Sequence, residues 1–331
     1  MQTRKLGPFE VSSLGLGCMN LSMGYGPADA AESEQLLLEA LDAGYNFLDT
    51  AAMYGDGHNE KLLGRVLSAR RDQVILASKC GISKTADHKL AINGRPEAIR
   101  ATCEQSLKNL QTEIIDLYYL HRIDPQVAVE ESAGALGDLV TEGKIRTIGL
   151  SEASTENLHR AHGEHPVTAV QSEYSLWSRT PERKMLAACK ELGVTFVPFS
   201  PLARGFLAGA AQDVSKLGED DLRASIARPR FEPDNFVENS KLLVPFRKIA
   251  ESQGCTMAQL ALAWILANEE GTLVPIPGTR NLKHMKENAG AESVALDQKT
   301  VLALDDLINE ETIEGDRYNA TLMESTDSEK D

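Results

Sequence analysis

The sequence predicts an α/β protein in which strands and helices alternate and close into a single (β/α)8 TIM barrel, with a long loop after the seventh strand. Short apolar runs suited to strands recur along the chain, and stretches with helical spacing of apolar residues lie between them. No series of strands occurs without intervening helices, which favours a parallel sheet. Eight such units favour a closed barrel over an open sheet.

The strand candidates are short apolar runs bounded by glycine, asparagine or charged residues. They are Leu14–Met19, Phe47–Thr50, Val74–Lys79, Ile114–His121, Ile145–Leu150, Thr168–Gln171, Thr195–Ser200 and Leu273–Ile276. In a parallel barrel the carboxyl ends of all these strands meet on one face, where active sites are built.

The helix candidates carry start and stop signals. Gly44, Gly143 and Gly193 each stop a helix, Pro96 suits a first helical turn, and Ser154 is a candidate N-cap. The candidates are Ala31–Ala43, Asn59–Leu67, Pro96–Leu110, Val129–Glu142, Thr155–His162, Pro181–Leu192 and a helix from about Asn281.

We expect one domain over residues 1–324 and a polar, disordered tail over 325–331. The insertion Ala208–Asn239 shows little periodicity and follows strand seven, at the predicted active face. A loop of that length inside a compact domain is usually functional.

The composition narrows the class of partner and compartment. The net charge of −15 argues against nucleic acid or an anionic membrane as a partner. Five dispersed cysteines form no Cys-x-x-Cys pair, and the first residues lead into no apolar signal core. The longest apolar stretch, Ala258–Ala267, is too short to span a bilayer. We therefore expect a soluble cytoplasmic protein that acts on a small molecule.

Four ionisable side chains follow the ends of successive strand candidates. Asp49 ends one run and Tyr54 follows it five residues later, Lys79 ends the next run, and His121 ends the one after that. A phenol has a pKa of about 10, and a nearby ammonium lowers that value. This set could donate a proton to a carbonyl oxygen while a hydride reaches the carbon. The alternative is that each residue merely caps a strand and pairs with a neighbour.

No metal site is predicted. His159, His162 and His165 are spaced three apart, but this spacing drifts around a helix and no acidic or cysteine partner completes a ligand set.

With these residues the chain resembles the aldo-keto reductases. Asp49-Thr50-Ala51-Ala52-Met53-Tyr54-Gly55 is similar to that family's Asp–Tyr motif, and Lys79 and His121 stand where its other catalytic residues are expected. The resemblance extends from Arg4 to Asn288. It is strongest to the microbial and plant branch that includes pyridoxal and perakine reductases, through the stretches 121–124 and 171–179.

The resemblance implies an NADPH (NADP+) site at the strand ends without a Gly-x-Gly-x-x-Gly motif. Asp49, Gly17 and Met19 would lie in the cofactor groove, Ser151 and Gln171 would hold the nicotinamide carboxamide, and Phe199 would stack on the ring. The pyrophosphate-facing positions are Ser200, Leu202, Arg204, Gly205 and Leu207. The adenosine-end positions are Gly278, Thr279, Arg280, His284, Glu287 and Asn288.

Two positions depart from the family pattern: Glu152 stands where asparagine is frequent, and His284 where many relatives carry an arginine for the 2′-phosphate. The stretch Pro277–Arg280 between the last strand and a helix independently suits an anion. We expect Arg280 and His284 to share one helix face there.

Two classes of function are open at this point. One is an NADPH-dependent aldehyde or ketone reductase with Tyr54 as general acid. The other is a nicotinamide-binding sensor, similar to the channel-associated β subunits of the same superfamily, because such subunits keep the four residues. The sequence contains no motif that selects one carbonyl substrate, one reaction direction or one oligomeric state.

Overall fold

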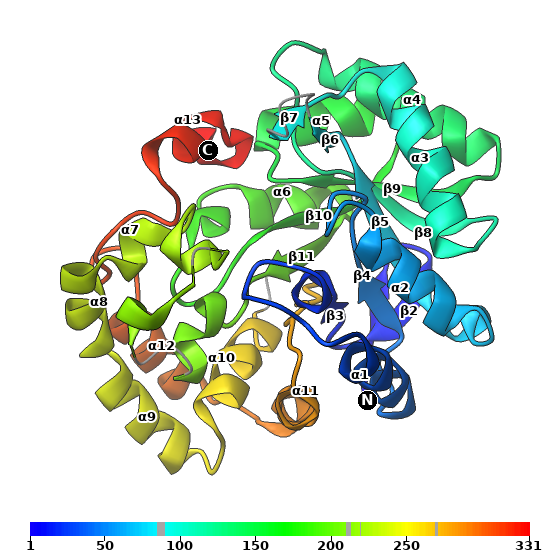
Figure 1. Ribbon diagram of the computed structural model, residues 1–331. Helices are drawn as coiled ribbons and strands as arrows, with labels where there is room; N and C mark the ends of the chain where they lie inside the picture. The colour runs from blue at the N-terminus through cyan, green and yellow to red at the C-terminus, as the bar shows by residue number, and fades with distance from the viewer. Residues whose placement is uncertain (85–89, 210–212, 219, 269–270) are drawn as a thin grey trace.

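A computed structural model describes residues 1–84, 90–209, 213–218, 220–268 and 271–331. At its centre seven parallel strands pair in the order β11-β10-β9-β8-β5-β4-β3 and curve into a barrel surrounded by helices (Figure 1). The strands are β3 (Leu16–Gly17), β4 (Phe47–Asp49), β5 (Ile75–Cys80), β8 (Ile115–Leu120), β9 (Ile145–Ser151), β10 (Val167–Glu173) and β11 (Thr195–Phe199).

The eighth position of the barrel is filled by residues 273–278, which bridge both edge strands in parallel. Leu273 pairs with Phe196 of β11, and Gly278 pairs with Gly17 of β3. Pro275 and Pro277 alternate along this segment and have no N–H to donate, so it forms isolated bridges rather than a regular ladder. The (β/α)8 barrel expected from the sequence is thereby confirmed, with an irregular eighth strand.

The outer helices follow the expected order. They are α1 (Ala30–Asp42), α2 (His58–Leu67), α3 (Pro96–Leu110), α4 (Val129–Thr141), α5 (Thr155–Glu164), α6 (Met185–Leu192), α9 (Leu243–Ser252), α10 (Met257–Leu266), α11 (Leu282–Ala289) and α12 (Gln298–Leu307). Helix α10 begins with a capping box between Thr256 and Gln259. In the described parts of the chain, none of the helices has the length and apolar character needed to cross a bilayer.

Two hairpins were not predicted. Strands β1 (Thr3–Leu6) and β2 (Phe9–Ser12) form an antiparallel pair before the barrel, and β6 (Ile82–Lys84) pairs with β7 (Leu90–Ile92) after β5. Leu6 and Val11 of the first hairpin are fully buried against the apolar residues inside the barrel. This hairpin therefore closes the barrel at the end opposite the carboxyl termini of the strands.

The insertion after β11, of which residues 210–212 and 219 lie outside the described part, is more ordered than expected. It contains short helices η5 (Val214–Lys216), η6 (Leu222–Ala224), α7 (Arg228–Phe231) and α8 (Pro233–Ser240). Asp221 and Tyr25 form an isolated antiparallel β-bridge, and the Leu222 N–H donates to the Gly24 carbonyl at 2.9 Å. The insertion thus reaches the loop that follows β3.

Residues 325–331, for which the sequence predicts a disordered tail, begin at the last residue of α13 (Ala320–Ser325). They include the short helix η8 (Asp327–Lys330), which lies beside the start of α5 (Figure 1). One Asp327 oxygen accepts hydrogen bonds from the Ser154 N–H and the Asn157 amide, both at 2.7 Å. A polar segment of this kind gains order because its carboxylates satisfy backbone donors at a helix N-terminus.

The inside of the barrel is built in layers, because alternate residues of a strand point to the same side. Phe47, Ala77, Leu117, Ala169 and Val197 belong to one buried apolar cluster inside the barrel. Two residues further along, the same faces carry Asp49, Lys79, Tyr119, Gln171 and Phe199. The inner layers thus change from apolar to polar at the ends of the strands.

Candidate active site

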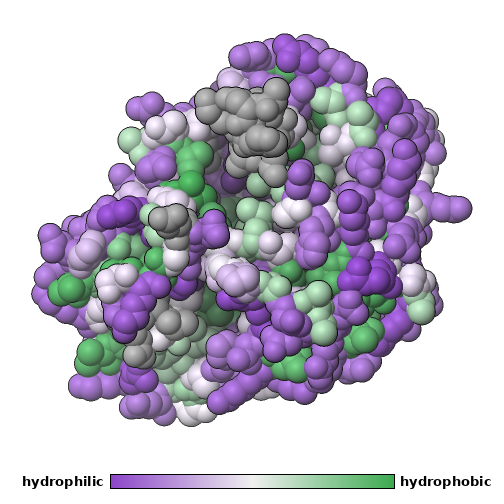
Figure 2. Space-filling model, in the orientation of Figure 1, coloured by the Kyte–Doolittle hydropathy of each residue, from purple (hydrophilic) through white to green (hydrophobic). Residues whose placement is uncertain are grey.

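The four ionisable residues expected at the strand ends lie together. Asp49 ends β4, Lys79 lies near the end of β5, His121 directly follows β8, and Tyr54 lies in the loop between β4 and α2. All four are buried, and Tyr54 and His121 are the most accessible at 8% and 7% exposed. Figure 2, which has the orientation of Figure 1, shows that hydrophilic residues cover most of this face of the molecule and that more apolar residues lie near its centre.

Lys79 is the centre of this group. Its Nζ lies 2.5 Å from Asp49 Oδ1, 2.8 Å from the Thr50 carbonyl and 3.4 Å from the Tyr54 hydroxyl. The remaining Asp49 oxygen accepts a hydrogen bond from Gln171 Nε2 at 2.8 Å. The ammonium therefore touches both the carboxylate and the phenol, and it leaves the phenol at the more open side.

Hydrogen bonds fix the loop that carries Tyr54. Thr50 Oγ1 donates to Asn59 Oδ1 at 2.5 Å, and the Asn59 amide donates to the Cys18 carbonyl and to Ser22 Oγ. Sequence reasoning had not identified Thr50 or Asn59 as part of the site. The structural feature that marks them is Asn59, a polar side chain that is buried in the first turn of α2 and therefore needs hydrogen-bond partners.

Burial and charge oppose each other in this group. Burial raises the pKa of the Tyr54 phenol, and the Lys79 ammonium reduces that rise without cancelling it. Lys79 thus lowers the phenol pKa as expected, but burial has the larger effect and the pKa stays above its usual value. Burial would lower the pKa of Lys79, but Asp49 and Tyr54 raise it above its usual range. The phenol is thus protonated and the lysine charged at neutral pH.

His121 is uncharged at neutral pH. Burial, followed by the charges of Arg122 and Lys79, holds its pKa well below the usual range. The ring packs edge-on against Tyr54, with centroids 5.9 Å apart. Arg122, which sequence reasoning missed, donates to the His121 carbonyl at 2.6 Å and to Ser151 Oγ at 3.3 Å.

The residues expected to hold a nicotinamide carboxamide lie next to this group. Ser151 and Gln171 are register partners on β9 and β10, and both are buried. A hydroxyl and an amide together offer the donors and acceptors that a carboxamide requires. Phe199 ends β11 and is only partly buried, so one part of its ring is available for stacking. The residues present therefore fit a nicotinamide group.

The loop after β11 holds the expected pyrophosphate-facing residues in an unusual backbone. Ser200, Ala203 and Arg204 have φ angles of 49°, 51° and 55°, which non-glycine residues adopt rarely. The N–H groups of Ala203, Gly205 and Leu207 donate to carbonyls of Ser200 and Leu202, and these bonds hold the loop in this conformation. Leu202, Gly205 and Leu207 lie in or beside the short helix η4 (Ala203–Ala208). The Arg204 guanidinium, however, is buried in an ion pair with Glu173 at 2.6 Å.

The expected adenosine end is more open. Gly17 and Gly278 pair closely, because a Cβ on Gly278 would lie 2.8 Å from the Gly17 carbonyl oxygen. Met19 lies in the short helix η1 (Met19–Leu21). Thr279 and Asn288 are buried, while Glu287 is partly exposed.

Arg280 and His284 do not share a helix face, because α11 begins only at Leu282. Arg280 precedes the helix and donates to the backbone carbonyls of Tyr25, Gly26 and Pro27. His284 is exposed in the first turn, and the Asn281 side chain already accepts from its N–H. The helix N-terminus is therefore partly capped by the chain itself.

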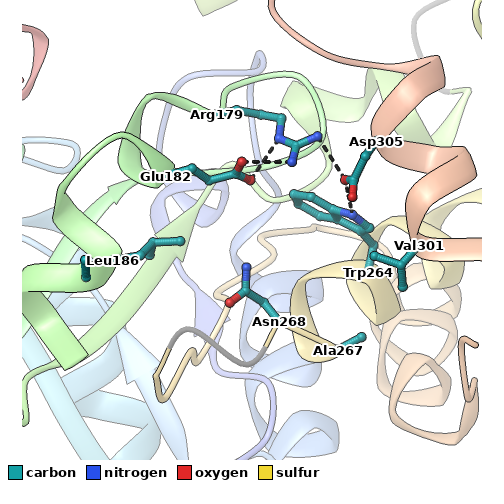
Figure 3. Close-up of a pocket in the computed structure, with 9 residues that line it drawn as sticks. Arg179, Glu182, Leu186, Trp264, Ala267, Asn268, Val301 and Asp305 are labelled. Carbon is teal, nitrogen blue, oxygen red and sulfur yellow. Dashed lines mark hydrogen bonds and ion pairs between the residues drawn. The ribbon is translucent and has the colours of Figure 1, made fainter. Parts of the chain in front are cut away.

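A separate cavity of about 330 Å³ lies outside the barrel between α6, α10 and α12. Its charged side chains pair with one another (Figure 3). Arg179 contacts Glu182 at 2.8 Å and Asp305 at 2.9 Å, and the Trp264 indole donates to Asp305. No catalytic group expected from the sequence lies there, so the strand ends remain the candidate site.

Known proteins resemble this chain over nearly its full length. The pattern of the Aldo/keto reductase family matches residues 13–309. A Glycine max protein named "Probable aldo-keto reductase 1" is 41% identical over 322 residues, which is 96% of this chain and 92% of that protein.

Solved structures agree with this match. The glycerol dehydrogenase AKR11B4 of Gluconobacter oxydans has a TM-score of 0.84 and 28% identity, covering 92% of this chain and 94% of its own. An aldo/keto reductase from Klebsiella pneumoniae, solved with NADP and acetate, has a TM-score of 0.70 and 27% identity over 94% and 95% of the two chains. With the fold, the sequence match and these neighbours in agreement, the chain belongs to the aldo/keto reductase family and is an NAD(P)H-dependent oxidoreductase.

Proposed function

We propose that this protein is a cytoplasmic, NADPH-dependent reductase that converts aldehydes or ketones to alcohols. The observation that carries the proposal is the buried contact of Lys79 Nζ with both Asp49 and the Tyr54 hydroxyl. A protonated phenol beside a fixed cation is suited to giving a proton to an oxygen that gains negative charge.

Each of the four residues has a separate role in the proposal. Tyr54 is the general acid, and Lys79 stabilises the phenolate that remains after proton transfer. Asp49 compensates the buried ammonium and holds it in place. His121 is uncharged and lies against the Tyr54 ring, so it can orient the carbonyl oxygen by a neutral hydrogen bond.

The cofactor, when bound, supplies the hydride. Ser151 and Gln171 would hold its carboxamide, Phe199 would contact the ring, and the loop from Ser200 to Leu207 would face the pyrophosphate. Arg280 and His284 would meet the 2′-phosphate that distinguishes NADPH from NADH. The Klebsiella pneumoniae neighbour with bound NADP supports this choice of cofactor.

The test is NADPH oxidation by the purified protein, followed by absorbance, with a panel of aliphatic and aromatic aldehydes, dicarbonyl compounds and ketones. We expect turnover with at least one member of the panel, at a rate on the order of 1 per second or faster. NADPH binding without turnover on any aldehyde or ketone would contradict the proposal and favour the nicotinamide-binding sensor.

A further inference from the structure

Four charged side chains are buried together where the C-terminal segment meets the barrel. They are Glu152, Glu173, Arg204 and Arg317, and none is more than 8% exposed. Arg317 contacts Glu152 at 2.5 Å and lies 3.7 Å from Glu173, and Arg204 contacts Glu173 at 2.6 Å. A buried charge is costly unless it is paired, so each member depends on the others.

The two glutamates directly adjoin the residues proposed to hold the carboxamide. Glu152 follows Ser151 in the chain, and Glu173 lies two residues beyond Gln171 on the same side of β10. Glu152 Oε1 also accepts the Glu173 N–H at 2.9 Å, and Glu152 has a φ of 54°, a conformation unusual for a side chain of this size. The position of this carboxylate therefore fixes the ends of both strands.

Arg317 supplies the opposite charge from the far end of the chain. It also contacts Glu329, while its backbone carbonyl accepts a hydrogen bond from Arg204 at 3.0 Å. Ser328 donates from its hydroxyl to Glu152 Oε2 at 2.6 Å and from its backbone N–H to the Glu152 carbonyl at 3.0 Å. The segment once expected to be disordered thus completes the shell behind the cofactor groove.

We propose that Arg317 is a positioning residue for the nicotinamide end of the cofactor site: by neutralising Glu152 it holds the strand ends that carry Ser151 and Gln171, and by its carbonyl it holds Arg204. The inference rests on the proposed NADPH site. It explains why glutamate stands at a position where the family often has asparagine: here the side chain faces an arginine from the C-terminal segment.

The charge balance gives the proposal a pH signature. Burial would raise the pKa of Glu152, but Arg317 and its hydrogen bonds, with Arg122 further away, lower it to about 2. The other charged or titratable groups around the cluster are Glu173, Arg204, Arg230, Tyr318 and Glu329. Without Arg317, only Arg122 and the remaining hydrogen bonds oppose the rise that burial causes in the pKa of Glu152, so the carboxyl takes up a proton more readily as pH falls. Ionisation at higher pH then displaces the strand ends.

The experiment measures the dissociation constant of NADPH by fluorescence quenching between about pH 6 and about pH 8.5, together with the thermal midpoint of the cofactor-free protein. For Arg317→Met we expect binding within about threefold of wild type at the lowest pH and weaker by about tenfold or more at the highest. The double variant Glu152→Gln/Arg317→Met leaves no uncompensated carboxylate, so its affinity should be independent of pH and within about fivefold of wild type. Arg183→Met, which removes an exposed arginine paired with Glu310, is the matched control and should resemble wild type.

Each result decides the proposal. A pH-independent weakening by Arg317→Met, or a thermal midpoint that moves while the NADPH affinity of the folded variant does not, shows that Arg317 only anchors the C-terminal segment. If Arg317→Met does not fold, the double variant carries the test, and its failure to fold or to bind NADPH overturns the neutralising role. Failure of the wild type to bind NADPH contradicts the proposed function, whereas a normal wild type with an inert Arg317→Met contradicts this inference alone.

Discussion

The two ends of the proposed cofactor groove are built in different ways. At the nicotinamide end, Asp49 and Lys79 are at most 2% exposed and form a buried ion pair on adjacent strands. At the adenosine end, His284 is exposed on the first turn of α11, and Arg280 is engaged with carbonyls of the loop at 25–27. The first end is fixed by the barrel itself, and the second depends on loops.

This difference indicates where the protein can vary. Strand ends in a closed barrel hold their side chains by register, so the groups proposed for proton transfer have little freedom. Arg280 must exchange its three carbonyl partners for a phosphate if it is to bind one, so under the proposal NADPH binding would release the loop after β3. We therefore expect changes at the nicotinamide end to alter the chemical rate and changes at the adenosine end to alter affinity.

The largest expected effect is that of Tyr54→Phe. The variant keeps the ring that packs against His121 and removes only the hydroxyl that Lys79 contacts. General acid catalysis is typically worth about 10²–10⁴-fold, so kcat for aldehyde reduction should fall by that factor. Steady-state kinetics with circular dichroism as a folding check make the measurement. A rate within a few-fold of wild type shows that Tyr54 is not the acid.

Lys79→Met should affect both stability and catalysis. The change leaves Asp49 buried without its cation, and breaking a buried pair in this way costs about 3–5 kcal/mol. Lys79 also restrains the rise in the Tyr54 pKa, so its loss should raise that pKa further and move the alkaline fall in activity to higher pH.

Urea unfolding and a pH–rate profile check the Lys79 prediction. Because the pKa of Lys79 is raised in the folded state, its own stabilisation is complete below the unfolded value and is lost as pH rises through the folded one. Lys286→Met, at the exposed pair with Glu39, is the control and should leave stability and profile unchanged. If Lys79→Met also leaves the stability and the pH–rate profile unchanged, Lys79 has no catalytic role and merely lies at the end of a strand.

Arg280→Ala tests the adenosine end. A charge-assisted hydrogen bond contributes about 1.5–3 kcal/mol, so NADPH should bind roughly 10–100-fold more weakly. The affinity for NADH should fall less, because NADH lacks the 2′-phosphate. The substitution affects NADH binding only by removing the hydrogen bonds between Arg280 and the loop at Tyr25–Pro27. Fluorescence titration with both cofactors gives the ratio. An equal loss of affinity for NADPH and NADH would show that Arg280 only holds the loop and does not contact the 2′-phosphate.

The smallest expected effect is that of His284→Gln. An imidazole N–H can donate a hydrogen bond to a phosphate in addition to the bonds from Arg280. NADPH should bind more weakly to His284→Gln than to the wild type, and NADH, which lacks the 2′-phosphate, should bind both equally well; fluorescence titration with the two cofactors makes the measurement. The effect should be only a few-fold, because the side chain is exposed and screened. Unchanged NADPH affinity, or an equal loss for NADPH and NADH, would show that His284 does not contact the 2′-phosphate.

The sequence predicted the barrel and the group around Lys79 because both depend on local pattern. Apolar runs set the strands, and the change from Phe47 to Asp49 or from Ala77 to Lys79 marks where the inner layer becomes polar. The four residues lie within 75 positions of one another and on neighbouring strands, so their meeting follows from topology alone.

What the sequence could not predict depends on contacts between distant segments. The polar residues from Ser325 to Asp331 match the pattern of a disordered tail, and only the structure shows that Ser328 donates to Glu152, 176 positions earlier in the chain. The hydrogen bonds from Arg280 to carbonyls 253 or more positions away are likewise contacts between distant segments. Local propensity carries no information about such partners.

The central claim is that the nicotinamide end sets the rate of the chemical step and the adenosine end sets the affinity for NADPH. It is tested most directly by pre-steady-state kinetics of Tyr54→Phe and Arg280→Ala, each preloaded with saturating NADPH and mixed with excess aldehyde. Stopped-flow absorbance gives the rate of hydride transfer, and titration gives the dissociation constant of NADPH. We predict that Tyr54→Phe slows hydride transfer by about 10²–10⁴-fold with NADPH affinity within a few-fold of wild type. Arg280→Ala should weaken NADPH roughly 10–100-fold while changing the saturated rate by less than a few-fold. If Tyr54→Phe weakens NADPH as much as Arg280→Ala does, or if both slow hydride transfer equally, the two ends do not act separately.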